Sequence, residues 1–349
     1  MSSAPLSSSL LRPVTESMLG RARWHPLEII FWLVAFAAIW LLPTRHLILT
    51  EIAWLGLFAL SLDLIVGYAG IISLGHAAFF GVGAYAAALF AKHELINEPV
   101  AALFAAGLVA MGLGFVTSFL VLRGTDLTRL MVSLGVALML RELANQLGWL
   151  TGGADGLQGV VMQPILGQFR FDMFGHNGYA YCLLVLFFLF LVARQIANSP
   201  FGLSLVAIKN NPLRAAAIGI PVDRRLIAIY SIAAFYAGIA GGLLAQTSSF
   251  ASLDVFSFDR SADLLLVLII GGVGYLYGGL IGAILFKVMQ DYLSVLTPQY
   301  WPFWIGALLV AMVLIGRDRI TAWNAPLRNL AARLDWRATR RATAAAEDR

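Results

Sequence analysis

A few ionisable side chains interrupt otherwise apolar stretches of the sequence, and their types limit the chemistry available. Asp63, the adjacent pair Arg141 and Glu142, and Lys287 with Asp291 all fall among residues such as Leu, Val and Phe. Charged groups inside a membrane are costly and usually functional, so a gradient-driven carrier is one hypothesis. The (i, i+4) pair Lys287 and Asp291 can instead form an internal ion pair. These few groups form no evident proton relay.

Two of the polar sites allow both a functional and a structural interpretation. Glu142 lies beside Arg141 and near Asn145 and Gln146, so this cluster either lines a solute pathway or serves helix packing. His76 has no evident carboxylate neighbour in the sequence, which favours a histidine held in a helix interface over a proton relay.

Nucleotide, metal and redox chemistry lack their usual residues. None of the three lysines, Lys92, Lys209 and Lys287, follows a glycine, so a phosphate-binding loop of the form G-x-x-x-x-G-K-[ST] is absent. The single cysteine, Cys182, forms neither an intrachain disulfide nor a metal cluster. We therefore predict no catalytic residue, no cofactor and no metal site. Energy for transport must come from a partner or from an ion gradient.

The composition is that of a membrane protein. Of the 349 residues, 60% are hydrophobic and 12% are charged, whereas a soluble domain carries roughly 25% charged residues. The chain has too little polar surface to coat a water-soluble globule. We predict an all-α, polytopic transmembrane domain, and we attribute the net charge of +5 to membrane orientation rather than to nucleic-acid binding.

Apolar stretches near the length of a membrane span predict about ten helices. The stretch 262–296 is too long for one crossing, since 35 residues would extend about 52 Å as a helix. Its closely spaced glycines predict a break at about 275–278. The predicted helices are 27–43, 47–66, 77–92, 99–122, 130–150, 179–197, 226–246, the two parts of 262–296, and 301–316.

The basic residues predict the orientation. Most Lys and Arg residues fall on one side of the membrane if there are ten crossings, and the arginine-rich C-terminus is then cytoplasmic together with the N-terminus. We predict an uncleaved first helix, a cytoplasmic segment 1–26, a membrane domain 27–318 with a cytoplasmic loop 198–225, and a basic tail 319–349. The tail suits either a surface helix or a disordered segment.

Three segments between the spans have compositions that indicate function. The first, 67–85, joins two spans with five glycines and no charge, and includes Gly67, Gly70, Ser73, Gly75 and His76. Its small residues allow close helix approach, and an interruption before Ser73 is similar to the broken helices of transporters. Tight packing alone is the structural alternative.

The second segment, 151–159, begins with Thr151, Gly152 and Gly153 and opens the longest external loop. Its glycines and Asp155 predict an ordered turn structure at the outer face, where a partner or an incoming solute could bind. A simple external loop is the alternative.

The third segment, 199–220, is cytoplasmic and too polar to span the membrane. We predict a short helix, a turn at the Asn-Asn-Pro sequence, and an alanine-rich helix that Asn211 caps and that starts at Pro212. Gly219 and Pro221 end it. A short helix lying across the inner face suits the docking of another protein; a mere linker is the alternative.

These three segments, in this order, resemble the permease subunits of branched-chain amino-acid ABC importers, a family that also includes urea-type members. The family shows a Gly-Tyr-Ala-Gly-Gln-Ile-Ser-Leu-Gly-His-Ala-like segment, a Thr-Gly-Gly segment, and a cytoplasmic loop of the type Arg-Glu-Asn…Ala-Ala…Gly-Ile. The Gly-rich element 270–274 matches a fourth family motif, and the resemblance covers about 50–318. This chain has Ile71 in place of the usual Gln, Asn210 after Lys209 in place of Arg-Glu, and a different sequence at 124–127.

The resemblance implies an inner-membrane importer subunit that pairs with a second homologous permease, two cytoplasmic ATPase subunits and a periplasmic binding protein. It implies that 199–220 contains the coupling helix that receives the ATPase movement. Candidate coupling residues are Lys209, Asn210, Pro212, Arg214, Ala216 and Gly219. Candidates for the translocation pathway or for packing are Gly67, Gly70, Ser73, Gly75, His76, Glu142, Thr151, Gly152 and Gly153. A branched-chain or related amino acid is the expected solute; urea, short amides and aromatic acids are alternatives.

Overall fold

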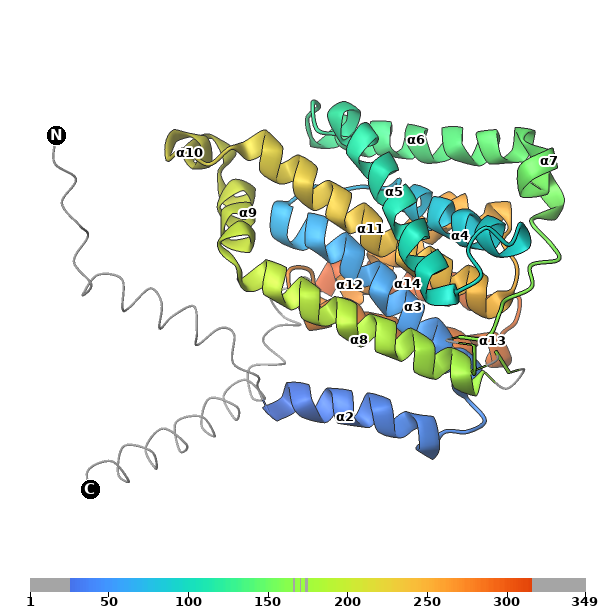
Figure 1. Cartoon of the computed structure of the whole chain (residues 1–349). Coiled ribbons are helices and arrows are strands. Elements are labelled where there is room, and N and C mark those ends of the chain that lie inside the picture. The colour runs from blue at the N-terminus through green and yellow to red at the C-terminus, as the bar shows by residue number, and fades with distance from the viewer. Residues whose placement is uncertain (1–25, 166, 170, 173–174, 316–349) are drawn as a thin grey trace, which may run out of the picture. The chain divides into compact units, whose positions relative to one another are not determined.

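The computed structural model describes residues 26–165, 167–169, 171–172 and 175–315. The predicted N-terminal segment and the basic tail lie almost wholly outside these residues. Helices account for 79% of the described chain (Figure 1). They are α2 (Pro26–Leu41), α3 (His46–Asp63), α4 (Ala77–Lys92), α5 (Pro99–Val121), α6 (Asp126–Gln146), α7 (Gly148–Thr151), α8 (His176–Asn198), α9 (Pro200–Asn210), α10 (Pro212–Ala217), α11 (Val222–Ser248), α12 (Phe258–Gly271), α13 (Leu276–Leu296) and α14 (Trp301–Ile315).

A helix occupies each of the ten predicted stretches within the described residues, which confirms the all-α polytopic fold. In the part of the chain that the structure describes, five helical segments are long and apolar enough to cross a membrane: His46–Ala69, Pro99–Val121, His176–Asn198, Val222–Ser248 and Leu276–Leu296. Two shorter apolar helices are Pro26–Leu41 and Ala77–Lys92. The orientation of the termini stays a prediction.

The predicted break in the long C-terminal stretch occurs a few residues earlier than expected. α12 ends at Gly271 and α13 begins at Leu276, and Gly272 and Gly274 between them have positive φ angles of 102° and 83°. The expectation that Gly278 and Gly279 belong to the break was wrong. Both lie inside α13, where a Cβ on Gly279 would lie 3.1 Å from the backbone of Ala59 in α3. Gly279 thus allows close contact between α13 and α3, whereas a Cβ on Gly278 would overlap the Gly272 carbonyl in the break.

The chain forms two compact units, Met1–Lys287 and Val288–Arg349. In the first unit, α11 packs along α5 and α4 and also contacts α3. Small residues let α4 and α11 approach closely: a Cβ on Gly83 would overlap the backbone of Gly238, and one on Gly241 would overlap the carbonyl of Phe80. α3 and α11 are mostly buried, whereas α5 and α8 expose large hydrophobic side chains such as Phe104, Val116 and Phe188, as lipid-facing helices do.

Candidate functional site

The glycine-rich segment breaks the helical path between α3 and α4. α3 continues into a π-helical turn, Leu64–Ala69, which ends at Gly70 in the left-handed conformation with φ of 74°. Residues 70–76 are non-helical, as predicted, and α4 starts at Ala77. The spacing in steps of four residues from Gly67 through Gly75 to Gly83 would place these glycines on one face of a single helix, but the break at 70–76 separates them. π-turns are rare and frequently occur at functional sites.

Polar side chains from distant helices hold the non-helical stretch in place. The Leu74 amide donates to Ser133 Oγ of α6 at 3.3 Å, and the Ala77 amide donates to Ser261 Oγ of α12 at 3.1 Å. A Cβ on Gly75 would overlap the Ser133 carbonyl. Gly75 thus lies where the segment packs against α6, and Ser73 in the same segment is buried.

His76 is fully buried and interacts with neutral groups. Its Nε2 lies 2.8 Å from Ser61 Oγ, and its ring stacks on Phe58 with centroids 5.8 Å apart. Because the Ser61 hydroxyl also lies 2.5 Å from the Phe58 carbonyl and can donate to it, His76 Nε2 is assigned as the donor to Ser61. This arrangement fits the histidine of a helix interface.

The glycine-rich segment 67–85, the loop 199–220 and the Gly-rich element 270–274 meet at Gly67. The Gly274 amide donates to Asp63 Oδ1 at 2.6 Å, and Lys209 Nζ donates to the Gly67 carbonyl, also at 2.6 Å. A Cβ on Gly67 would overlap both the Asp63 carboxyl group and Gly274 Cα, so only glycine fits. We call Asp63, Gly67, Gly70, Lys209 and Gly274 the inner joint.

Helix physics explains why Lys209 binds at this position. Carbonyl groups at the end of a helix lack intrahelical partners and carry partial negative charge, which favours a nearby cation. Gly67 lies in the last turn of the π-helical segment, and the Lys209 stem packs against Gly70. The inner joint therefore ties α9 to the end of α3 through one long side chain.

Segment 199–220, predicted to be cytoplasmic, folds as predicted into two helices. Ser199 caps α9, and Asn211 caps α10 by accepting a hydrogen bond from the Arg214 amide at 2.9 Å. Pro212 is the first residue of α10, and Gly219 follows it with φ of 88°. The residues Asn210, Pro212, Arg214, Ala216 and Gly219 are all exposed.

The Thr-Gly-Gly segment forms an ordered turn, as predicted. Thr151 Oγ1 donates to the Ala144 carbonyl of α6, and Gly152 has φ of 80° with no room for a Cβ against the Gly156 backbone. The Leu157 amide donates to the Ala251 carbonyl at 2.7 Å, beyond the end of α11. We call residues 151–157 with Ala251 the outer cap.

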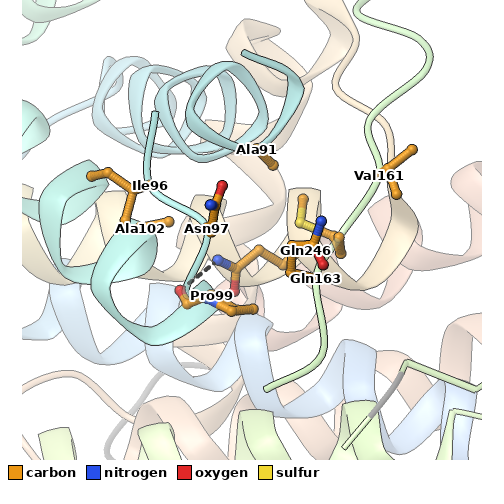
Figure 2. Close-up of a pocket in the computed structure, with 9 residues that line it drawn as sticks. Ala91, Ile96, Asn97, Pro99, Ala102, Val161, Gln163 and Gln246 are labelled. Carbon is orange, nitrogen blue, oxygen red and sulfur yellow. Dashed lines mark hydrogen bonds between the residues drawn. The ribbon is translucent and has the colours of Figure 1, made fainter. Parts of the chain in front are cut away.

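A small cavity lined by Pro99, Val161, Gln163 and Gln246 contains a buried amide group, that of Gln246 (Figure 2). Gln246 Nε2 donates to the Pro99 carbonyl at 2.8 Å, and Gln246 Oε1 accepts from the Tyr181 hydroxyl at 3.0 Å. The cavity volume is only about 10 Å³, which is at the limit for one water molecule. This amide joins α5, α8 and α11 and does not form a solute site.

Glu142 lies apart from the inner joint, on an exposed face of α6, and accepts a hydrogen bond from Gln146 at 2.7 Å. Sequence reasoning missed two ion pairs. Arg194, near the end of the predicted helix 179–197, is buried and pairs with Glu28, and Lys287 Nζ lies 2.6 Å from Glu51 Oε2. The sequence does show a basic and an acidic residue at similar depths of two predicted helices in each pair. It does not specify which helices are neighbours, so the pairs could not be predicted.

The fold and these sites define a polytopic helical membrane protein of the transport-permease class. Residues 44–314 match the family described as branched-chain amino acid transport system / permease component. The chain therefore belongs to this family of ABC transporter permeases, as its motifs indicated.

Known relatives agree with this family. The chain is 26% identical over 280 residues to the high-affinity branched-chain amino acid transport system permease protein LivM of Escherichia coli K12, and equally to that of Salmonella typhimurium. Each match spans 74% of this chain and 65% of LivM. A galactose/methyl galactoside import permease, MglC of Haemophilus influenzae, is 32% identical over 124 residues, 33% of this chain and 36% of MglC. No solved structure matches significantly.

Proposed function

We propose that this chain is the membrane-spanning permease subunit of an ATP-driven importer that moves a branched-chain or related amino acid across the inner membrane. A separate subunit hydrolyses the ATP. The names of the LivM relatives support the solute class, and the lack of a phosphate-binding loop in the sequence supports a separate motor.

The observation that carries this proposal is the hydrogen bond between Lys209 Nζ and the Gly67 carbonyl. It connects the cytoplasmic loop directly to the glycine-rich break in the membrane domain. A movement of α9 driven from the cytoplasm would change the end of α3 without an intermediate element. Energetic coupling between two elements travels through hydrogen bonds and packed side chains such as this one.

The short helix α10 supplies a docking surface for the ATPase. Leu213 is 84% exposed and Ile218 is 71% exposed, with Arg214 between them. Exposed hydrophobic side chains bordered by charge are typical of protein contacts. We propose that α10 inserts into a groove of the ATPase subunit and that α9 transmits its movement to the inner joint.

The exposed face of α6 fits a contact with the second permease. Glu142 and Gln146 lie on this face, and a Cβ on Gly135 would meet nothing within 4 Å. Charged and polar groups of a spanning helix face protein or water rather than lipid. We propose that a homologous permease covers Gly135, that Glu142 lines the shared pathway, and that a periplasmic binding protein delivers the solute to the outer face.

Uptake measurements test the proposal. Cells that express the complete importer should take up radiolabelled leucine, and this uptake should persist when the proton gradient is collapsed while ATP is maintained. Loss of uptake on collapse of the gradient alone would instead support a secondary carrier. The described contacts of Asp63 with Gly274 and of Lys287 with Glu51 give those ionisable groups structural roles, which weighs against a carrier.

The coupling assignment has its own test. Replacing Arg214 or Gly219 should reduce co-purification of the ATPase and leave membrane insertion intact, because both residues lie on the exposed docking surface. A matched control is Arg123→Ala, since Arg123 is also an exposed arginine but lies in a different loop. Normal co-purification with both loop variants would refute the assignment.

A further inference from the structure

A second cavity in the first unit lies next to the inner joint and is much larger than the one around Gln246. Its volume is about 160 Å³, similar to a cavity that can hold a benzene-sized molecule. It lies between the start of α2, the π-helical end of α3, the end of α8 and the start of α13. We call it the tyrosine cavity, after Tyr68, Tyr275 and Tyr277 in its wall.

Aromatic rings form one side of the tyrosine cavity. The centroids of Tyr275 and Tyr277 are 6.1 Å apart, and those of Tyr277 and Phe190 are 4.7 Å apart. The faces of such rings attract cations, and groups of aromatic rings are used to bind ammonium ions. A nearby carboxylate, Glu28, also lines the cavity and adds a full negative charge.

A positive charge, that of Arg194, also lies in the wall of the tyrosine cavity. Arg194 forms an ion pair with Glu28, so one positive and one negative group lie side by side at the cavity. The pair is neutral overall, so it does not favour a simple anion. A ligand with both an ammonium and an anionic group complements both charges at once.

The wall of the cavity also carries polar groups. Tyr277 is only 8% exposed, and its hydroxyl lies close to the Trp32 side chain. The Asn198 amide, also in the wall, adds further hydrogen-bonding capacity.

We propose that the tyrosine cavity is a binding site for a zwitterion that combines a primary ammonium group with an anionic oxygen group. The ammonium lies against the tyrosine rings and Glu28, and the anionic group lies near Arg194. A free amino acid and a phosphatidylethanolamine headgroup share this chemistry. Tyr68 adjoins Gly67, and Asn198 lies two residues before the start of α9. An occupied cavity would therefore stabilise the inner joint.

Binding to the purified full chain tests the proposal without ATP or uptake, so its outcome is independent of the proposed transport function. The probes are L-leucine and isovalerate, and short-chain phosphatidylethanolamine and phosphatidylglycerol. The readout is saturable thermal stabilisation. We expect leucine or phosphatidylethanolamine to stabilise the protein, and the active probe identifies the source of the ligand. Phosphatidylglycerol and isovalerate lack the ammonium group and should have no such effect.

Variants locate the binding. Tyr275→Ala should weaken binding of the active probe by about tenfold or more, since it removes one ring of an ammonium site. Tyr275 is 60% exposed, so its replacement should not prevent folding. Tyr277→Phe, which keeps the ring and loses the hydroxyl, should give a smaller loss. Tyr292→Ala is the matched control, because Tyr292 is exposed and does not line the cavity.

Three results would overturn the proposal. The first is that neither leucine nor phosphatidylethanolamine binds. The second is that isovalerate or phosphatidylglycerol binds equally well, which would remove the role of the ammonium group. The third is that Tyr275→Ala and Tyr277→Phe bind the active probe as tightly as Tyr292→Ala, which would place the binding elsewhere.

Discussion

The inner joint and the outer cap both contain glycines and polar contacts, yet they are built differently. The outer cap is held by short links: the Thr151 hydroxyl on the Ala144 carbonyl, and backbone hydrogen bonds between Leu157 and Ala251. The inner joint depends on two ionisable side chains, Asp63 and Lys209, that reach backbone groups of other elements. Short backbone links leave little freedom, whereas a lysine has a long and flexible stem.

This difference teaches where movement can occur. A π-helical turn followed by a left-handed glycine gives the end of α3 an irregular backbone that can rearrange. The outer cap has its irregular backbone locked against Gly156 and Ala251. We infer that the cap is a fixed support and that the joint is the element that changes during transport.

The largest effect is expected from Gly67→Val. The added side chain would overlap Asp63 and Gly274, and such overpacking costs about 1–3 kcal/mol. Uptake should be almost abolished because the valine side chain would push Asp63 and Gly274 apart. Gly112→Val is the matched control, since a Cβ on Gly112 would meet nothing within 4 Å. Equal uptake by the two variants would contradict a special role for Gly67.

A smaller effect is expected from Gly152→Ala in the outer cap. Gly152 has a φ of 80°, which is unfavourable for alanine, and the alanine Cβ would also overlap the Gly156 backbone. The free energy of unfolding should therefore fall by about 1–3 kcal/mol. Gly159→Ala has a similar φ of 73° but open space around it. Thermal unfolding of both variants separates strain from crowding, and an equal loss would exclude crowding as the cause.

The smallest effect on stability is expected from Lys209→Met. It removes one hydrogen bond from an ammonium group. Because Lys209 is exposed and solvent screens its charge, the free energy of unfolding should fall by about 1 kcal/mol, less than the roughly 1.5–3 kcal/mol of a hydrogen bond to a buried charged group. Solute uptake per ATP hydrolysed should nevertheless drop clearly. Lys92→Met, at the exposed end of α4, is the control. If Lys209→Met kept its uptake per ATP but lost much stability, the joint would be a structural contact alone.

The helices were largely predictable because hydrophobic length and charge determine which segments enter a membrane. The predicted helix 77–92 matches α4, and Asn211 caps α10 as its residue type indicated. Caps and turns are formed by residues close together in the sequence, so the sequence alone can predict them. For the same reason the short helices of segment 199–220 were predicted correctly.

The contacts between segments were not predictable. Asp63, Lys209 and Gly274 come together only because three elements far apart in the sequence meet. The sequence indicated that Asp63 was unusual but gave no partner for it. Gly278 and Gly279 looked like part of a turn because glycine serves both turns and close helix packing. Only the neighbouring helix decides between these uses.

A reversible cross-link tests the role of the inner joint most directly. A Cβ on Gly70 would lie 3.5 Å from Lys209 Cβ, within the range of about 3.5–4.5 Å that a disulfide requires. Gly70→Cys and Lys209→Cys can be combined with Cys182→Ser, which replaces the single native cysteine. Each single-cysteine variant in the same background is the control for the strain at Gly70.

The decisive measurement is solute uptake by the assembled importer before oxidation, after oxidation and after reduction. Because Lys209→Cys also removes the hydrogen bond to Gly67, the lowered rate before oxidation is the reference. If the joint must change during transport, oxidation should stop this remaining uptake in the double-cysteine protein alone, and reduction should restore it. Uptake that continues at the full rate with the cross-link formed would contradict the account.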